Sequence, residues 1–397
     1  MKKNRIIFHV DVNSAFLSWT AVEKLRKGEK IDIREIPSVI GGDEAARHGV
    51  VLAKSTPAKR YGIVTGESLY SARKKCPEVL IFSPSFSIYR ESSAKLMKLL
   101  KEYTPLIEQY SIDECFMDLT LDIGGLSSME LAQLIKSRVK KELGFTVNIG
   151  ISTNKVLAKM ASELEKPDKI NTLYEDEIET KLWPLPVGEL FMVGRSAKEK
   201  LNKLFIRNIG ELANFDVNIL VSKFKSYGRL IWEYANGIDN SKVNSSDEVV
   251  KIISNSTTLS ADITKLEEIK KVLVELCETV SSRLRKDGRC CTSVTVVIRT
   301  NNFKNYSHQK TFKNPTNSTK SIIEISNTIF VEMWRREPIR LLGVQLSGLC
   351  NGEVKQISIF DDNSDEKNAA LDKAIDSIRQ KYGVSSIKRL STLKGKN

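Results

Sequence analysis

The sequence predicts an α+β multidomain protein, with a ferredoxin-like βαββαβ sheet in its first half and a second α/β module in its last third. Residues 5–152 alternate apolar strands with amphipathic helices in the order of a split βαβ fold. A polar stretch rich in Asn and Ser, residues 236–249, then separates a helical region from a second series of strands and helices. The length of 397 residues is enough for about two to four domains.

Hydrophobic patterns and helix end signals predict the elements of the first module. Residues 5–12, RIIFHVDV, are typical of a mostly buried strand, and residues 89–103 carry leucines at helical spacing before a proline. Two strands follow, at 105–112 and 114–120. The helix at 127–144 begins with a serine cap and a glutamate three positions later and ends at a glycine. The strand FTVNIGIS, residues 145–152, completes the sheet, and an insertion at roughly 15–82 follows the first strand.

The positive charge is concentrated in the last module. After a region of short helices at 174–240 come strands at 251–260, 291–301 and 339–349, with helices near 265–286 and 318–334. Residues 283–320 hold nine Lys or Arg against one Asp, whereas residues 174–240 hold nine basic and ten acidic residues. This concentration favours a nucleic-acid backbone as the partner over an ordinary solvated face.

Composition excludes several classes of protein. The net charge of +13 and pI of about 9.3 favour a polyanionic partner. No apolar run reaches the length of a membrane span, and charged and polar residues from His9 onward interrupt the first one, so we expect a cytoplasmic protein without membrane association. Six cysteines without CxxC spacing and only three histidines argue against a zinc site and for free thiols.

Two adjacent carboxylates stand in the half-buried stretch YSIDECFMDLT, residues 110–120. Burial and a neighbouring like charge both raise the pKa of a carboxyl group, so an idle Asp113–Glu114 pair would destabilise the fold. Asp11 ends the first strand, which in a βαββαβ sheet lies next to this hairpin, and we expect the three carboxylates at one end of the sheet. Without Asp11, exposed turn residues would be the better interpretation of the pair.

Three such carboxylates predict a metal-dependent phosphoryl-transfer enzyme. Oxygen ligands without His or Cys select Mg²⁺ or Mn²⁺. Two such ions about 3.5–4 Å apart can activate an attacking oxygen and stabilise a leaving one.

Three stretches in fixed order resemble a known family. FHVDVNSAF (8–16), YSIDECFMDLT (110–120) and NIGISTNKVLAKMASELEKPD (148–168) are similar to the Y-family, or translesion, DNA polymerases of the bacterial polymerase IV type, over about residues 5 to 360. The resemblance implies a right-hand polymerase fold. Its parts would be a ferredoxin-like palm (1–14 and 83–173), small fingers (15–82), a helical thumb with hairpin-like turns (174–240), a linker (241–251), an α/β little finger that binds DNA (252–351) and a C-terminal tail (352–397).

The resemblance also implies the reaction: attack of a primer 3′-oxygen on the α-phosphate of a dNTP, templated by DNA, with release of pyrophosphate. It maps Asp11 and Asp113 onto metal-bridging aspartates, Glu114 onto a third catalytic carboxylate and Val12 onto a carbonyl ligand. Two Mg²⁺ ions would be bound, with Mn²⁺ as a substitute. The resemblance further implies low fidelity, no proofreading and a role in DNA damage bypass and repair.

Four further residues match positions that contact the nucleotide. Phe16 matches the steric gate that rejects a 2′-hydroxyl, although its pattern alone also fits a core phenylalanine. Lys166 matches a lysine near the triphosphate. Thr56 and Lys59 stand where relatives often carry Tyr and Arg, so the bidentate fork of arginine is lost.

The segment VKQISIFDD, residues 354–362, resembles the peptide that docks bacterial polymerases on the beta subunit of the sliding clamp. Gln356, Ile359 and Phe360 would provide its contacts, and an edge strand is the alternative. The expected partners are thus primer–template DNA, dNTP and the clamp, for a monomeric enzyme. Residues 368–383 are predicted to form an amphipathic helix without an assigned role.

Two other functions fit parts of the sequence. A nucleotidyl cyclase can use the same sheet and metal carboxylates, but would not need the basic module or a clamp peptide. A non-catalytic nucleic-acid-binding protein can share the strand order of RNA-recognition modules. That alternative leaves Asp11, Asp113 and Glu114 unexplained and lacks an aromatic signature on the central strands.

Overall fold

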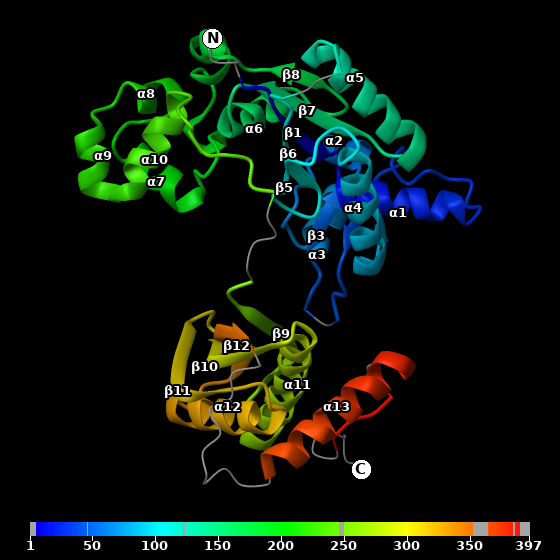
Figure 1. The fold of residues 1–397 in the computed structure, drawn as a ribbon, viewed down its shortest axis with the longest axis vertical. Helices are drawn as coiled ribbons and strands as arrows, with labels where there is room; N and C mark the ends of the chain where they lie inside the picture. Colours follow the sequence, from blue (N-terminus) through cyan, green and yellow to red (C-terminus); the bar gives the residue numbers. More distant parts are fainter. Residues whose placement is uncertain are drawn as a thin grey trace. The chain divides into compact units, whose positions relative to one another are not determined.

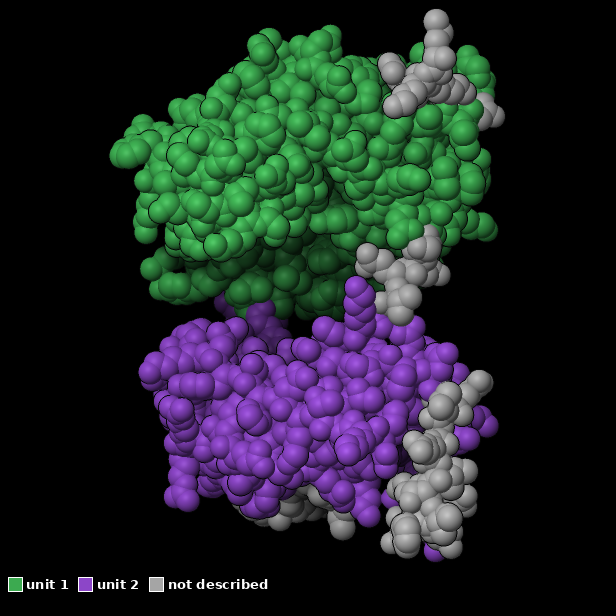
Figure 2. Space-filling model, turned by 60° about the vertical axis from the view of Figure 1, so that its left-hand side comes forward, with its two compact units in different colours: residues 1–42, 49–247 green, residues 43–48, 248–397 purple. Residues whose placement is uncertain are grey.

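A computed structural model describes residues 5–45, 47–121, 124–245, 250–351, 364–383 and 386–389. The chain divides into two compact units, residues 1–42 with 49–247 and residues 43–48 with 248–397 (Figure 2). The first unit contains a five-stranded and a three-stranded sheet, the second contains a four-stranded sheet, and each unit has its own hydrophobic core.

The main sheet of the first unit has the predicted ferredoxin-like core. Its strands lie in the order β5-β6-β1-β7-β8 (Figure 1), with bounds β1 (Ile7–Val12), β5 (Ile107–Gln109), β6 (Glu114–Asp118), β7 (Val147–Ser152) and β8 (Ile170–Thr172). Helices α4 (Phe86–Leu100) and α5 (Ser128–Arg138) connect β1 to β5 and β6 to β7, which gives βαββαβ. β8 is an additional strand, parallel to β7, that the sequence patterns did not predict.

The two faces of this sheet are covered by different helices. On one face, Phe8, Val10 and Val12 pack in a cluster with apolar residues of α4 and α5. α6 (Lys155–Leu164) packs against β1 and β7 on the other face. Because side chains alternate along a strand, His9 and Asp11 point to the α6 face.

Gly150 of β7 allows α6 to lie directly against the strand. A Cβ at this position would lie 2.0 Å from the carbonyl oxygen of Ala158 and 2.4 Å from the backbone nitrogen of Ser162. Any other residue would therefore push the helix away from the sheet. This close packing determines how far the side chains of α6 reach over β1 and β6.

The insertion after β1 begins with a helix and continues as a small sheet in the order β3-β2-β4. Its elements are α1 (Ala15–Arg26), β2 (Ser38–Gly41), β3 (Val51–Lys54), α2 (Thr56–Arg60), α3 (Leu69–Lys75) and β4 (Leu80–Phe82). Trp19 of α1 is buried in the cluster of the main sheet, whereas Leu17 joins residues of β2 and β3. α1 thus connects the insertion to the main sheet.

Short helices lie within and after the main-sheet segment. They are η1 (Val139–Leu143), which continues α5, then η2 (Glu175–Glu177), η3 (Ile178–Leu182), η4 (Val187–Glu189), α7 (Arg195–Asn202), α8 (Ile209–Ala213), α9 (Val217–Phe224) and α10 (Ser226–Ala235). The apolar face of α6, with Leu157 and Met160, belongs to the same cluster as the helices from η3 onward. α6 is therefore packed between the main sheet and this helical region.

The second unit repeats the βαββαβ order of elements with a different strand order, β11-β10-β12-β9. The bounds are β9 (Ile253–Ile263), α11 (Leu266–Lys286), β10 (Arg289–Thr300), β11 (Asn305–Thr316), α12 (Thr319–Met333) and β12 (Ile339–Asn351). Both predicted helices are confirmed. Here the first strand, β9, lies at the edge of the sheet, whereas β1 is central in its own sheet.

The amphipathic helix predicted near the C-terminus is confirmed as α13 (Ser364–Tyr382), and charged side chains attach it to the second unit. Asp372 is 3% exposed and accepts a hydrogen bond from the backbone N–H of Thr319, the first residue of α12, at 2.9 Å. Arg285 of α11 donates to Asp372 and to Asp376. Asp372 therefore caps α12 from a distant part of the chain.

The clamp-like peptide with Gln356, Ile359 and Phe360 lies outside the described residues. All six cysteines lie within them and are free thiols. In the described ranges no helix combines the length and apolar character needed to cross a membrane.

Candidate active site

Asp11 and Glu114 lie directly opposite each other on the central strands β1 and β6. Next to this pair, the backbone N–H of Val12 donates to the carbonyl oxygen of Asp113 at 3.0 Å. The backbones of all three predicted carboxylates and of Val12 are thus adjacent at one end of the sheet. The antiparallel pairing of β1 with β6 produces this arrangement, as the βαββαβ order predicted.

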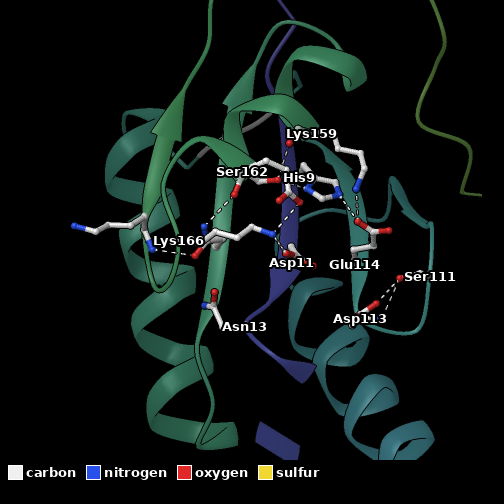
Figure 3. Close-up of polar contacts among 12 residues, drawn as sticks. His9, Asp11, Asn13, Ser111, Asp113, Glu114, Lys159, Ser162 and Lys166 are labelled. Carbon is white, nitrogen blue, oxygen red and sulfur yellow. Dashed lines mark hydrogen bonds and ion pairs between the residues drawn. The ribbon is translucent and has the colours of Figure 1, made fainter. Parts of the chain in front are cut away.

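Lys166 forms an ion pair with Asp11. Its Nζ lies 2.5 Å from Asp11 Oδ2 and 2.8 Å from Glu163 Oε1 (Figure 3). Burial raises the pKa of Asp11 to about 6, although the neighbouring Lys166 lowers it. For Lys166, burial acts to lower the pKa, but the two carboxylates more than offset this and raise it. Lys166 is therefore the cation that favours the ionised form of Asp11.

Glu114 is held from two sides. Its Oε2 lies 2.5 Å from Nζ of Lys159 on α6 and 3.1 Å from Nε2 of His9 on β1 (Figure 3). Burial acts to raise the pKa of Glu114, but the hydrogen bonds from His9 and Lys159 and the charge of Lys159 lower it to about 2. Glu114 is therefore ionised at neutral pH.

His9 is completely buried between Glu114 and Ser162. Its Nδ1 lies 2.8 Å from Ser162 Oγ. Burial lowers the pKa of His9, which favours the neutral ring. A neutral ring that donates from Nε2–H to Glu114 has Nδ1 left as an acceptor, so the one hydroxyl proton of Ser162 is shared between His9 Nδ1 and the carbonyl oxygen of Lys159, each 2.8 Å from Ser162 Oγ. His9 then orients the carboxylate of Glu114 without adding a charge.

The side chain of Asp113 turns to a third partner, Ser111, whose hydroxyl donates to Asp113 Oδ1 at 2.5 Å. Asp11 thus contacts Lys166, Glu114 contacts Lys159 and His9, and Asp113 contacts Ser111 (Figure 3). Within the described ranges, no three Asp, Glu, His or Cys side chains are grouped as a ready metal site. The structure brings the carboxylates to one place but directs their side chains to different partners.

The donor set nevertheless fits a hard divalent cation. Asp11, Asp113 and Glu114 offer carboxylate oxygens, and the imidazole of His9 is engaged with Glu114 and Ser162. Oxygen donors of this kind suit Mg²⁺ or Mn²⁺ and do not suit zinc. The raised pKa of Asp11, caused by burial, indicates that this desolvated carboxyl group gains from additional positive charge.

Phe16 lies in an aromatic cluster near the start of α1. Its ring stacks on Tyr89 of α4, with centroids 4.4 Å apart and 8° between the planes, and meets Phe86 edge-on at 6.1 Å. The side chain is half-buried. It is therefore held rigidly while part of the ring stays accessible.

Thr56 and Lys59 both lie on the short helix α2 of the insertion, and both are exposed. Ser55 caps the helix by accepting from the backbone N–H of Ala58 at 3.1 Å. Burial, and then the charge of Lys59, lower the pKa of the nearby Lys54. α2 thus presents a hydroxyl and an ammonium group to solvent beside a second lysine.

Comparisons with known proteins agree with these observations. The family model "impB/mucB/samB family" matches residues 10–163, and the model of its C-terminal domain matches residues 250–359. The chain is 66% identical to DNA polymerase IV of Clostridium acetobutylicum over 97% of this chain and 98% of that one. It is 37% identical to DNA polymerase IV 2 of Bacillus subtilis over 99% and 96%. The chain belongs to the Y-family of DNA polymerases.

A solved structure supports the fold of this Y-family chain. A Y-family DNA polymerase chimera matches 87% of this chain and 99% of its own, with a TM-score of 0.76 and 22% sequence identity. The prediction of a right-hand fold with palm, small fingers, helical thumb and α/β little finger is thereby confirmed. Family membership favours a DNA-directed DNA polymerase over a nucleotidyl cyclase or a non-catalytic binding protein.

Sequence reasoning missed the residues that hold Glu114 in this Y-family chain. Lys159 and Ser162 lie within the stretch at 148–168, and His9 within the first strand, but no role was predicted for them. A signal was present for two of them, because Lys159 and Ser162 are three residues apart on α6 and so lie on the same side of that helix. Which lysine meets which carboxylate depends on how α6 docks at Gly150.

Proposed function

We propose that this polymerase carries out translesion synthesis, adding dNTPs to a primer 3′ end with two Mg²⁺ ions, with low fidelity and without proofreading. The observation that supports this best is the pairing of Asp11 with Glu114, with Asp113 adjacent. We further assign the palm, fingers, thumb, linker and little finger to the residue ranges expected from the sequence. The role in DNA damage bypass rests on the family alone.

Asp11, Asp113, Glu114 and the carbonyl group of Val12 would hold the metal ions. Bound Mg²⁺ supplies positive charge that lowers the pKa of the primer hydroxyl and neutralises charge on the triphosphate. The protein's own contribution is positioning. His9 and Lys159 keep Glu114 ionised and oriented, and Lys166 does the same for Asp11.

Residues of the insertion at 15–82, together with Lys166, would bind the nucleotide and discriminate its sugar. Thr56 and Lys59 on α2, with Lys166, would bind the triphosphate as hydrogen-bond donors and point charges. The ring of Phe16, fixed by Tyr89, would lie beneath the sugar and exclude a 2′-hydroxyl. A lysine at position 59 gives weaker orientation of phosphate than arginine would, because it cannot form a bidentate contact.

DNA binding is assigned to the basic part of the second unit, residues 283–320, which run from the last turn of α11 through β10 and β11 to the start of α12. Because this contact would neutralise several phosphates, we expect binding to weaken steeply as salt rises. Between 50 and 200 mM salt, a protein that contacts six or more phosphates loses about 10³-fold or more in affinity for DNA. Nearly constant affinity for a primer–template over this range would contradict the assignment.

Docking on the sliding clamp through Gln356, Ile359 and Phe360 is proposed from the sequence alone, for a monomeric polymerase. Apolar side chains at 359 and 360 would enter a pocket of the clamp and the glutamine would fix the orientation. Replacing Ile359 and Phe360 together by alanine should abolish clamp-stimulated extension and leave extension without the clamp unchanged. Equal stimulation of both proteins would reject this partner.

The central test is extension of an undamaged primer–template with dNTPs and Mg²⁺. The native chain should add nucleotides, and Asp113→Asn should remove this activity by about 10³-fold or more, as expected for loss of a transition-state charge partner. Asp118→Asn is the matched control, because Asp113 immediately precedes β6 whereas Asp118 is at the far end of β6, paired with Ile7. Binding of DNA without extension, in Mg²⁺ or Mn²⁺, would overturn the proposal.

A further inference from the structure

Lys159 connects Glu114 to two aromatic rings. Its Nζ, 2.5 Å from Glu114 Oε2, lies 5.4 Å from the ring centre of Phe191 and 5.7 Å from that of Tyr110. The two rings touch each other edge-on, with centroids 5.8 Å apart and planes at 67°. The ammonium group is therefore surrounded by one carboxylate and two ring faces.

This ion pair is largely removed from solvent. The side chains of Lys159 and Glu114 are 14% and 16% exposed. Cation–π attraction is stronger at desolvated sites than at exposed ones, because water does not compete for the cation. The rings of Phe191 and Tyr110 therefore contribute to where the ammonium group lies.

Two other carboxylates line a cavity next to Lys159. The cavity has a volume of about 340 Å³ and is lined by Lys159, Met160, Glu163, Glu189 and Phe191. A lysine has several rotatable bonds, so its ammonium group could turn into this space toward Glu163 or Glu189. The ring of Phe191 forms part of the wall and favours the position beside Glu114.

The helical region fixes Phe191 in turn. Its ring stacks on Tyr234 of α10, with centroids 6.0 Å apart and 15° between planes. Its backbone N–H donates to Met160 Sδ of α6 at 3.4 Å. Phe191 follows η4, so a residue of the helical region reaches the active-site lysine.

We infer that Phe191 is a positioning residue for Glu114, which it orients through the ammonium group of Lys159. The inference rests on the proposed function, in which Glu114 is one of the reacting carboxylates. It makes the rate of nucleotide addition depend on an aromatic contact outside the main sheet. A ring at 191 is required for this effect, whereas an aliphatic side chain of similar size only fills space.

Single-nucleotide incorporation by four proteins tests the requirement for a ring: the native chain, Phe191→Leu, Phe191→Tyr and the control Phe224→Leu. Phe224 is a half-buried ring of the same cluster, and its ring contact is with Tyr227. We expect Phe191→Leu to lower kcat about 3- to 10-fold, with the KM for dNTP changed less than about 2-fold, as loss of a desolvated cation–π contact implies. Phe191→Tyr should restore the rate, and Phe224→Leu should keep it.

A double-mutant cycle with Lys159→Met tests the route through the lysine. If Phe191 acts through Lys159, Phe191→Leu has no further effect on kcat once the ammonium group is gone. If the losses in kcat of Phe191→Leu and Lys159→Met multiply in the double variant, Phe191 does not act through Lys159 and the inference is overturned. Equal losses of kcat in Phe191→Leu and Phe224→Leu would show that Phe191 only contributes packing, which also overturns it. A loss that Phe191→Tyr does not rescue would overturn it as well.

Binding of Mn²⁺, followed by the EPR signal of the free ion, gives a measure independent of catalysis. We expect Phe191→Leu to weaken Mn²⁺ binding about 2- to 5-fold in the native background and not in Glu114→Gln. Failure of the native chain to extend primers would refute the proposed function but not this coupling. The opposite result would refute only the coupling: primer extension requires Asp113, but Phe191→Leu leaves Mn²⁺ binding unchanged in both the native and the Glu114→Gln background.

Discussion

Lys166 and Asp11 are separated by 155 positions in the sequence, yet Lys166 Nζ lies 2.5 Å from Asp11 Oδ2. Burial and the charge of this lysine act on Asp11 in opposite directions, and the resulting pKa of Asp11 is about 6. The ionised form of Asp11, which we propose as a metal ligand, therefore depends on Lys166, two residues beyond the end of α6. Both residues were predicted as site residues, but their direct contact was not.

Replacing Lys166 by Met should move the acid limb of the pH–rate profile upward. Without the lysine, burial is less opposed and the pKa of Asp11 rises above about 6, so a smaller fraction of the group is ionised at pH 6.5. The rate of nucleotide incorporation, measured from pH 6 to 8.5, should fall more at pH 6.5 than at pH 8. Lys169→Met, at an exposed lysine three positions away, should leave the shape of the profile unchanged. An equal loss at every pH would show that Lys166 does not control Asp11.

The lowered pKa of Glu114 predicts that the stability of the protein depends on pH in buffer containing EDTA. Its pKa, 4.5 in an unfolded chain, is lowered to about 2 in the folded protein, because His9 and Lys159 outweigh the effect of burial. A lowered carboxyl pKa contributes stability that is present above about pH 4.5 and is lost as the pH falls toward 2. The difference in free energy of unfolding between the native chain and Glu114→Gln should therefore be largest near neutral pH and shrink below pH 4.5. A difference that stays constant down to pH 3 would contradict the ion pair.

Local patterns in the sequence carried enough information for the central sheet. The apolar runs of β1 and β6, together with the βαββαβ order, placed Asp11 and Glu114 at the same end of the sheet, and the register confirms this. Pairing of neighbouring strands depends on short patterns and on the order of elements, both of which are visible in one sequence. The predicted strand at 105–112 is shorter in the structure, where only Ile107–Gln109 pairs and the backbone then turns toward Asp113.

The partners of the carboxylates could not be predicted in the same way. Lys159, Ser162 and Lys166 reach the site because α6 lies against β7 at Gly150, a tertiary contact without a local signature. A lysine on a helix otherwise resembles many solvated lysines. The strand order of the second unit was equally hidden, since the same βαββαβ order gives an edge position to β9 and a central one to β1.

The C-terminal helix should be an integral part of the second unit, and Asp372 is the residue that tests this. Asp372→Ala removes the cap of α12 at Thr319 and leaves the buried Arg285 with one carboxylate fewer. Removing one partner of a buried pair and a helix cap together should lower the free energy of unfolding by about 3 kcal/mol. Asp376→Ala, at the more exposed partner of Arg285, should cost about 1 kcal/mol or less. Urea denaturation measures both, and equal small effects would mean that α13 is only loosely attached.

Replacing Phe16 should change the selection of the nucleotide sugar much more than it changes the stability of the protein. Phe16→Leu removes the ring that stacks on Tyr89 and opens space next to it, so incorporation of a ribonucleotide should rise about 10-fold or more relative to the matching deoxynucleotide. The lost ring contact should destabilise the protein by about 1 kcal/mol.

Phe86→Leu is the matched control for this change, because Phe86 meets both Phe16 and Tyr89 edge-on but is 55% exposed. It should lower stability slightly and keep the preference for deoxynucleotides. The ratio of kcat/KM for the two sugars separates the roles of the two rings. If Phe16→Leu only lowers stability and the ratio does not change, Phe16 is a core residue of the aromatic cluster. If both variants relax the preference equally, selection depends on the whole cluster and not on the ring of Phe16.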